Sequence, residues 1–101
     1  MSYRLRTSRR AGRLIRAAST WWLRNRDKAP LAFAEDLDDA FQLVQQFPYS
    51  GQPVHHPEIE SAHRVCLTRT RYYLYYSVDD QHRSVEILAI WHASRGEDAP
   101  L

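Results

Sequence analysis

Three arginines and one histidine in the C-terminal half of the chain have side chains that could act on a phosphate ester. They are Arg64, Arg71 and Arg95, with His92 three residues before the last arginine. Arginine can hold phosphate oxygens and stabilise negative charge that develops during a reaction. Histidine can accept or donate a proton at neutral pH. These residues could therefore hold a phosphate group and move a proton beside it, although a histidine near two arginines is also common on ordinary surfaces.

Basic residues crowd the first quarter of the chain and could bind an acidic partner. The formal net charge is only +2, but arginines recur from Arg4 to Arg26. Arg9, Arg13 and Arg16 lie on one side of an expected helix and are candidate partner-binding residues. Their partner could be an acidic protein or a nucleic acid. A solvated helix face would give the same pattern, and the charge run alone does not decide between the two.

Aromatic residues give a second set of candidate partner contacts. Trp21 follows the apolar stripe of the first helix at its margin, so it either packs against the second helix, which we favour, or stays exposed as an anchor. Tyr73 and Tyr75 share one face of an expected strand with Arg71. They could stack nucleic-acid bases, but tyrosine is also a residue that strands prefer.

The histidines and the cysteine do not predict a metal site. His55, His56 and His63 have no cysteine or carboxylate at a standard ligand spacing. Cys66 lies in an expected strand between apolar residues, which favours a buried or half-buried structural thiol over a nucleophile. We therefore expect no metal and no cofactor.

The chemistry-bearing residues must be positioned by two helices and a group of strands. Tyr3–Thr7 alternates as a short strand does. Apolar spacing predicts a helix from about Ser8, a plausible N-cap, to Asn25. A second helix follows, with Pro30 in its first turn and Pro48 ending it. The short connection makes the two helices an antiparallel hairpin.

The second half of the chain is predicted to be a loop followed by three strands. Residues Pro48–Ala62 have no helical period and read as a loop. The strands are His63–Thr68, Arg71–Val78 and Val85–Trp91, the last almost continuously apolar and therefore central. The expected fold class is α+β: a short N-terminal strand and a two-helix hairpin packed on a curved antiparallel sheet.

Length and composition suit one domain spanning residues 1–101. Hydrophobic residues make up 44% and charged residues 26% of the chain, which is ordinary for a globular protein. No apolar run is long enough to span a membrane, and the N-terminus does not resemble a secretory signal. The single cysteine fits a reducing environment, so we expect a cytoplasmic protein.

Four short motifs, in this order and spacing, resemble the RelE/ParE superfamily, the toxins of bacterial type II toxin–antitoxin pairs. They are Phe47-Pro48-x-x-Gly51, Arg64-x-x-x-Leu67, Tyr72-x-Leu74-x-Tyr76-x-Val78 and Ile87-x-x-x-Trp91-His92-x-x-Arg95. The ending from Trp91 to Gly96 is most similar to the ParE-like branch, although Ala93 and Ser94 stand where that branch often has a glycine and an arginine. The resemblance implies a curved sheet with a concave face opposite the helices.

The resemblance also implies a choice between two modes of action. RelE-type toxins cut mRNA on the ribosome without a metal, using two lysines where this chain has Arg64 and Cys66 and an arginine where it has Tyr73. ParE-type toxins lack that set and are associated with poisoning DNA gyrase through binding. We therefore expect a ParE-like gyrase inhibitor. The alternatives are an endoribonuclease that uses Arg64, Arg71, His92 and Arg95 on mRNA, ribosome-dependent or free, and a toxin fold that has lost its activity and only binds.

A cognate antitoxin is the partner that the resemblance implies. Antitoxins of this superfamily typically wrap the toxin with a C-terminal segment that covers the sheet groove and the helix hairpin. No membrane partner is expected. The candidate partner-binding residues are Arg9, Arg13, Arg16, Trp21, Tyr73, Tyr75 and Arg95.

Overall fold

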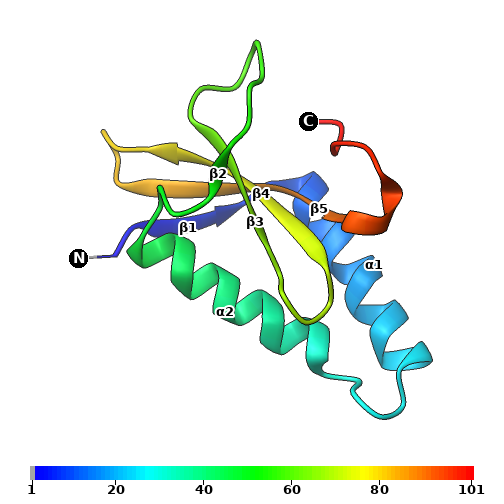
Figure 1. Ribbon diagram of the computed structural model, residues 1–101. Helices are drawn as coiled ribbons and strands as arrows, with labels where there is room; N and C mark the ends of the chain where they lie inside the picture. The colour runs from blue at the N-terminus through cyan, green and yellow to red at the C-terminus, as the bar shows by residue number, and fades with distance from the viewer. Residues whose placement is uncertain (1) are drawn as a thin grey trace.

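The computed structural model describes residues 2–101 and shows two helices packed on a five-stranded sheet (Figure 1). This α+β architecture confirms the expected fold class. In chain order, the elements are β1 (Arg4–Thr7), α1 (Arg9–Asn25), α2 (Ala32–Gln46), β2 (Gln52–Pro53), β3 (Ala62–Cys66), β4 (Tyr72–Asp79), β5 (Ser84–His92) and the short 3₁₀ helix η1 (Ala93–Arg95). None of the helices in this part of the chain is long and apolar enough to cross a membrane.

The sheet is mixed, with strand order β1-β5-β4-β3-β2. Strands β3 to β5 form the expected antiparallel meander, and β2 pairs antiparallel with β3 beside it. In contrast, β1 lies parallel to β5, with Arg4 opposite Ser84 and Leu5 opposite Val85. The parallel pairing is possible because both helices and two strands of the meander lie between β1 and β5 in the sequence, which gives the chain enough length to cross over. The expected central strand β5 thus lies between β4 and β1.

Helix α1 begins and ends close to the positions that its sequence predicts. The Ser8 side chain accepts a hydrogen bond of 3.1 Å from the Ala11 N–H, which confirms the expected N-cap. Small residues Ala11 and Ala18 are buried against the sheet, and Trp22 packs partly buried against the same core. The close approach of α1 to the sheet is possible because these buried side chains are small.

Helix α2 begins later than expected. Pro30 lies in the turn before the helix, whose first residue is Ala32. The predicted apolar stripe is confirmed, because Phe33, Leu37 and Val44 are all buried. The helix ends at Gln46, two residues before Pro48.

The loop and strand boundaries differ from the predictions in two places. The region expected to be a loop, Pro48–Ala62, contains the short strand β2, which pairs with β3 through Pro53 and His63. Strand β3 ends at Cys66 rather than Thr68, because a turn closed by a 2.8 Å hydrogen bond from the Arg71 N–H to the Leu67 carbonyl follows it. Arg71 itself has a positive φ of 67° and lies in that turn rather than in β4.

Each face of the sheet carries its own apolar cluster. On the helix face, the buried β4 residues Leu74, Tyr76 and Val78 pack with α1 and α2. On the opposite face, which we call the far face, Tyr75 and Ala89 pack with Ala99 from the C-terminal tail. A register irregularity between Tyr75 and Tyr76 lies in the middle of β4. The predicted alternation of β4 side chains is therefore confirmed.

The tail after β5 turns back over the far face, as the red segment of Figure 1 shows. Gly96 ends η1 in the left-handed conformation, with φ of 72°, which a residue without a Cβ adopts readily. Ala99 then lies on Tyr75 with only 7% of its surface exposed. The tail thereby forms part of the far face rather than a free end.

The expectation that Cys66 is buried is wrong. Side chains of β3 alternate, so the buried Val65 points toward the helices while its neighbours Arg64 and Cys66 point the other way. The Cys66 thiol is exposed. The apolar neighbours Val65 and Leu67 suggested burial, but no other part of the described chain covers Cys66 on the far face.

Candidate functional site

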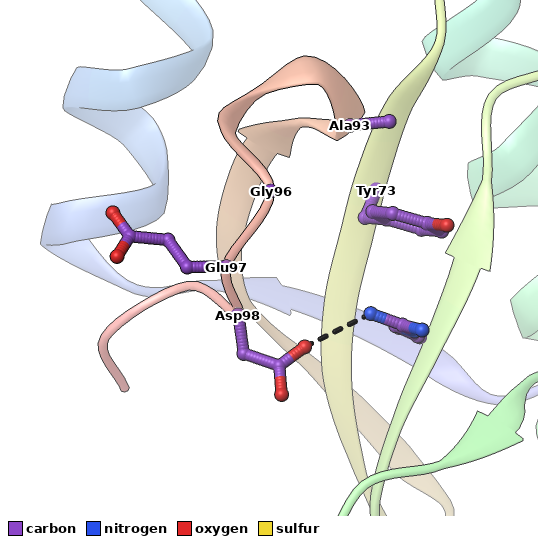
Figure 2. A pocket seen from close by; sticks show the side chains of 6 residues that line it. Tyr73, Ala93, Gly96, Glu97 and Asp98 are labelled. Carbon is purple, nitrogen blue, oxygen red and sulfur yellow. Dashed lines mark hydrogen bonds and ion pairs between the residues drawn. The ribbon is translucent and has the colours of Figure 1, made fainter.

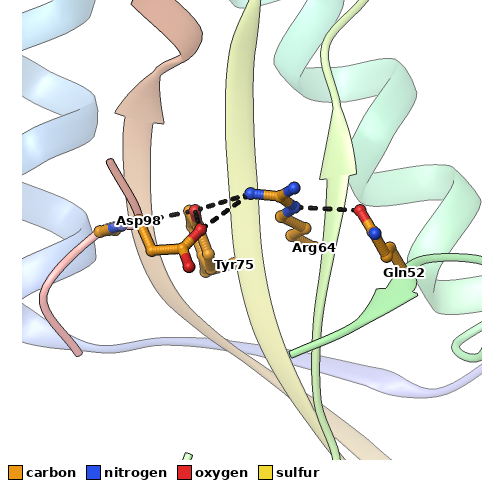
Figure 3. Close-up of polar contacts among 5 residues, drawn as sticks. Gln52, Arg64, Tyr75 and Asp98 are labelled. Atoms are coloured by element: carbon orange, nitrogen blue, oxygen red, sulfur yellow. Dashed lines mark hydrogen bonds and ion pairs between the residues drawn. The ribbon is translucent and has the colours of Figure 1, made fainter. Parts of the chain in front are cut away.

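Arg64 is the centre of a polar cluster on the far face. One terminal nitrogen, Nη1, lies 3.0 Å from Oδ1 of Asp98 and 3.4 Å from the hydroxyl of Tyr75. Its Nε donates a hydrogen bond of 3.2 Å to Oε1 of Gln52 (Figure 3). The guanidinium carbon lies 4.2 Å from the centre of the Tyr73 ring. Arg64 therefore has partners on both sides and an aromatic ring beneath it.

Three strands and the tail position this cluster. Arg64 lies opposite Tyr75 in the β3–β4 pairing and opposite Gln52 in the β2–β3 pairing, so the register fixes all three side chains on one face. Asp98 reaches them because the chain reverses at Gly96. The Tyr75 hydroxyl also contacts Asp98 at 3.3 Å and accepts a 3.4 Å hydrogen bond from the Ala99 N–H. Two consecutive tail residues, Asp98 and Ala99, thus contact the Tyr75 hydroxyl of β4.

A hollow of about 390 Å³ opens beside the cluster, lined by Arg64, Tyr73, Ala93, Gly96, Glu97 and Asp98. Figure 2 shows that the Glu97 side chain points away from Tyr73, whereas the Asp98 side chain points across the hollow to its ion-pair partner, Arg64. The pKa of Arg64 is raised above its usual value, first by its hydrogen bond with Tyr75. The guanidinium is therefore a permanent cation, and its side chain, 23% exposed, is already paired with a carboxylate of the same chain.

The four candidate nuclease residues lie on different sides of the sheet. Arg95 stacks 4.1 Å from the Trp91 ring, which belongs to the far-face cluster together with Tyr73. His92 lies on the helix face, where its ring contacts Tyr72 edge-to-face at 4.8 Å. Arg64 and Arg95 thus share a face, and the sheet separates them from His92.

The remaining candidate, Arg71, lies exposed in the turn before β4. Its carbonyl accepts a hydrogen bond of 2.8 Å from the Ala93 N–H, which joins this turn to the end of β5. The turn therefore places Arg71 just before the first residue of β4 and near the last residue of β5. Arg64, in contrast, lies in the middle of β3, opposite Tyr75.

The arginines of α1 lie where the sequence places them. Arg9, Arg13 and Arg16 are exposed and line a shallow hollow of about 430 Å³ with Thr7, Ser8 and Gly12. None of the residues that line this hollow is acidic. The α1 arginine face therefore offers three cations to an external partner.

The aromatic candidates differ in their accessibility. The preference for a packed Trp21 is wrong, because its side chain is 44% exposed and contacts Trp22 edge-to-face at 5.8 Å. One residue turns a helix by about 100°, which carries Trp21 off the buried stripe. Tyr73 is half-buried beneath Arg64, and Tyr75 is 1% exposed beneath the tail. A partner could reach Tyr75 only if the tail moved.

Residues 2–101 contain no group of three histidine, cysteine or carboxylate side chains that could hold a metal ion. His63 is buried, and its Nδ1–H donates a 2.9 Å hydrogen bond to the Ser61 carbonyl while its ring stacks on Tyr76. This histidine therefore serves the packing of β3 against β4.

Sequence reasoning missed Gln52, Asp98 and the tail. Gln52 was assigned to a loop, and nothing in the local sequence marks Asp98 as a partner of a residue 34 positions earlier. The one available signal was Gly96, a residue that commonly ends a helical turn in the left-handed conformation.

Comparisons with known proteins agree with this fold. A family model described as the ParE toxin of the type II toxin–antitoxin system parDE matches residues 5–96. The toxin–antitoxin complex RelBE2 from Mycobacterium tuberculosis contains a chain with 25% identity and a TM-score of 0.66, and the match covers 91% of this chain and 99% of that one. No match was found among curated proteins.

Two further solved structures share the fold at lower sequence identity. A chain of the chromosomal ParDE system of P. aeruginosa is 17% identical, with a TM-score of 0.69 and coverage of 90% of this chain and 96% of that one. A chain of the intact E. coli RelBE toxin–antitoxin complex is 18% identical, with a TM-score of 0.59 and coverage of 91% of this chain and 98% of that one.

Proposed function

Because the chain belongs to the ParE toxin family of type II toxin–antitoxin systems, we propose that it arrests growth by binding DNA gyrase, without bond-making chemistry of its own. The gyrase target comes from the sequence resemblance to the ParE-like branch. The proposed action takes place in the cytoplasm, where gyrase works and where a lone exposed thiol stays reduced.

The separation of His92 from Arg64 and Arg95 carries the proposal. Cleavage of RNA without a metal requires a proton-transferring group and a cation within hydrogen-bond reach of the same phosphate. Here the histidine lies on the helix face, and two of the three candidate arginines, Arg64 and Arg95, lie on the far face. Arg71 lies in the exposed turn before β4, so it is the one candidate arginine near His92. Arg64 is in addition paired with Asp98. This arrangement supports a binding mechanism over catalysis by these residues.

A cognate antitoxin is the second partner that we propose. The Mycobacterium tuberculosis and E. coli relatives were crystallised with their antitoxins. The exposed α1 arginine face suits an acidic antitoxin segment, and Trp21, Tyr73 and Arg95 add aromatic and cationic contacts. The charges would mainly speed the encounter of the two proteins.

The target is tested by expressing the chain alone in bacteria and assaying the purified protein on gyrase. We expect loss of supercoiling with intact cellular mRNA, and His92→Ala should inhibit supercoiling as strongly as the wild type. Cleaved mRNA with normal supercoiling would reject the proposal and favour the endoribonuclease alternative. A folded protein that causes neither effect would identify the chain as a binding protein that has lost its activity.

The antitoxin contact is tested separately through association rates. Replacing Arg9, Arg13 and Arg16 together by glutamine should slow association with the cognate antitoxin, and the effect should shrink as salt is added. The control is Arg4→Gln with Arg6→Gln, since these β1 arginines are also exposed but lie outside the α1 arginine face. Slowing in the control by about two thirds of the effect in the triple variant, on a logarithmic scale, would show that net charge directs the antitoxin, because the control loses two charges and the triple variant three.

A further inference from the structure

A second hollow lies on the helix side of the sheet, where α1 and β5 both end. Its volume is about 340 Å³, and its lining residues are Trp21, Trp22, Arg26, Tyr72 and His92. They come from the end of α1, the start of β4 and the end of β5. None of them is acidic, so the hollow presents aromatic surface and hydrogen-bond donors. We call it the tryptophan pocket.

The Arg26 guanidinium lies over both indole rings, which are inclined by 71° to each other. Its guanidinium carbon lies 4.9 Å from the centre of the Trp21 ring and 5.5 Å from that of Trp22. A stacked guanidinium keeps its N–H groups in the plane, where they remain available to an anion. Within residues 2–101 Arg26 forms no ion pair. The tryptophan pocket therefore contains a cation that no carboxylate of the described residues pairs with.

His92 contributes a second donor of defined orientation. Its Nδ1 accepts a hydrogen bond of 3.1 Å from the Ser94 N–H and lies 2.7 Å from the Ser94 hydroxyl. Because a backbone N–H can only donate, Nδ1 is the unprotonated nitrogen of the neutral ring. The proton of the neutral ring is then on Nε2. Ser94 thereby sets His92 to donate a hydrogen bond through Nε2.

Trp22 carries a third donor that lacks an acceptor. Its Nε1 is buried and has no hydrogen-bond partner within the described chain, which is an unfavourable state for a polar group. The Arg26 guanidinium lies over the same ring, with its carbon 5.5 Å from the ring centre. The neighbouring Trp21 side chain also lines the pocket, and 44% of its surface is exposed.

We propose that the tryptophan pocket binds one nucleotide of a single-stranded nucleic acid, with the base against Trp21 and the phosphate at Arg26 and His92. Every base has a flat face that can stack on an indole, and arginine and a neutral histidine both donate to phosphate oxygens. Exposed Arg24, Lys28 and Arg71 flank the lining residues in sequence and could follow the neighbouring phosphates. An acidic side chain of a protein would pair with Arg26 but leave the Trp21 ring without a stacking partner.

The test is a fluorescence titration of the purified toxin with a short single-stranded oligothymidylate, at low and at physiological salt. Stacking should quench tryptophan emission. Trp21→Ala should weaken binding by between about fivefold and about 150-fold, the range that loss of one stacked base produces. Arg26→Gln should also weaken it and reduce the dependence on salt by about one released ion.

Two matched controls separate the pocket from general charge and from the third tryptophan. Arg6→Gln removes the same charge from an exposed position on β1 and should leave affinity nearly unchanged. Trp91→Phe removes the indole of the far face and should keep the quenching. Thermal unfolding by circular dichroism verifies that each variant is folded. If either Trp21→Ala or Arg26→Gln fails to fold, the affinity of the other variant tests the proposal.

Three outcomes would overturn the proposal. They are the absence of quenching by the wild type at low salt, equal losses in Arg26→Gln and Arg6→Gln, or binding that does not depend on Trp21. Tighter, Trp21-dependent binding of a polyglutamate peptide would assign the pocket to an acidic protein instead. No gyrase is present in this titration, so its result is independent of the supercoiling assay.

Discussion

The carboxylate of Asp36 on α2 accepts a hydrogen bond of 2.8 Å from the hydroxyl of Thr70, in the turn between β3 and β4. The same oxygen also accepts from the backbone N–H groups of Arg69 at 3.1 Å and Thr70 at 2.9 Å. Asp36 and Thr70 are both buried, with 5% and 3% of their surfaces exposed. One buried side chain therefore joins the second helix to a turn 34 residues later in the chain.

Replacing Asp36 by alanine should destabilise the fold strongly. The Thr70 N–H and hydroxyl would stay buried without an acceptor, and each such group costs about 1–3 kcal/mol. We expect Asp36→Ala to lower the free energy of unfolding by about 3 kcal/mol, measured by urea denaturation. Asp38→Ala is the control on the same helix, because Asp38 is exposed and should change the value by less than about 0.5 kcal/mol. Equal effects would show that the Asp36 hydrogen bonds add nothing specific.

Two tyrosines that donate to Asp80 should make stability depend on pH at both extremes. The hydroxyls of Tyr3 and Tyr49 each lie 2.6 Å from the Asp80 carboxylate. These hydrogen bonds lower the pKa of Asp80, Tyr3 giving the larger effect, and raise the pKa of both tyrosines.

The sign of each effect follows from linkage. A lowered carboxyl pKa stabilises the fold above the unfolded value of 3.8, and this contribution is lost as pH falls through the folded pKa. A raised phenol pKa stabilises below the unfolded value of 10.0 and is lost as pH rises through the folded pKa. Asp80→Asn should therefore flatten the stability–pH curve below about 3.8 and above about 10. Thermal melts across the pH range measure this, with exposed Asp39→Asn as the control. An Asp80→Asn curve parallel to the wild type would contradict the prediction.

Gly51 and Gly12 should respond oppositely to alanine. A Cβ on Gly51 would lie 2.5 Å from the Tyr76 hydroxyl and 2.7 Å from the Arg64 carbonyl oxygen. That hydroxyl accepts from the Gly51 N–H at 3.1 Å and donates to the Pro48 carbonyl at 2.7 Å, so it has little freedom to move. We expect Gly51→Ala to cost about 2 kcal/mol of unfolding free energy.

Gly12 is the matched position, because a Cβ there meets only the flexible end of Arg16 at 3.4 Å. Since Gly12 lies inside α1, Gly12→Ala should stabilise by about 0.5–1 kcal/mol. Denaturant titrations of the two variants against the wild type measure both signs. A Gly51→Ala variant as stable as the wild type would show that the β2 region relaxes without cost.

The exposed Cys66 thiol should react in the folded protein. We expect a thiol-specific chromogenic reagent to modify it at a rate close to that of the unfolded chain, because no unfolding step is needed. Cys66→Ser should abolish the reaction and change stability by less than about 0.5 kcal/mol. Slow modification that speeds up only with denaturant would show that the thiol is covered.

Local sequence patterns were sufficient to predict the helices and strands. They did not predict which side chains other parts of the chain would bury. The helical spacing of Phe33, Leu37 and Val44 and the N-cap at Ser8 are properties of a few neighbouring residues, and both were confirmed. Exposure depends on what lies above a residue in three dimensions. For that reason Cys66 was expected to be buried, and Trp21 to be packed, although both are exposed.

The candidate site was predicted only in part for the same reason. The arginines were recognised by residue type, but their distribution over two faces follows from strand alternation and from the end of each strand. His92 and Trp91 are adjacent in the sequence and point to opposite faces. The pairing of Arg64 with Asp98 depends on a tail whose path is set by long-range packing.

The parallel pairing of β1 with β5 also determines when the sheet can be completed during synthesis. Strand β1, at residues 4–7, is made before both helices, and its partner at residues 84–87 is made after them. Until β5 has been made, α1 lacks the β5 residues against which it packs, and β1 lacks the strand beside which it lies. A translation product that stops short of β5 therefore cannot assemble the fold. Residues 4–7 therefore have no sheet partner until residues 84–87 have been made.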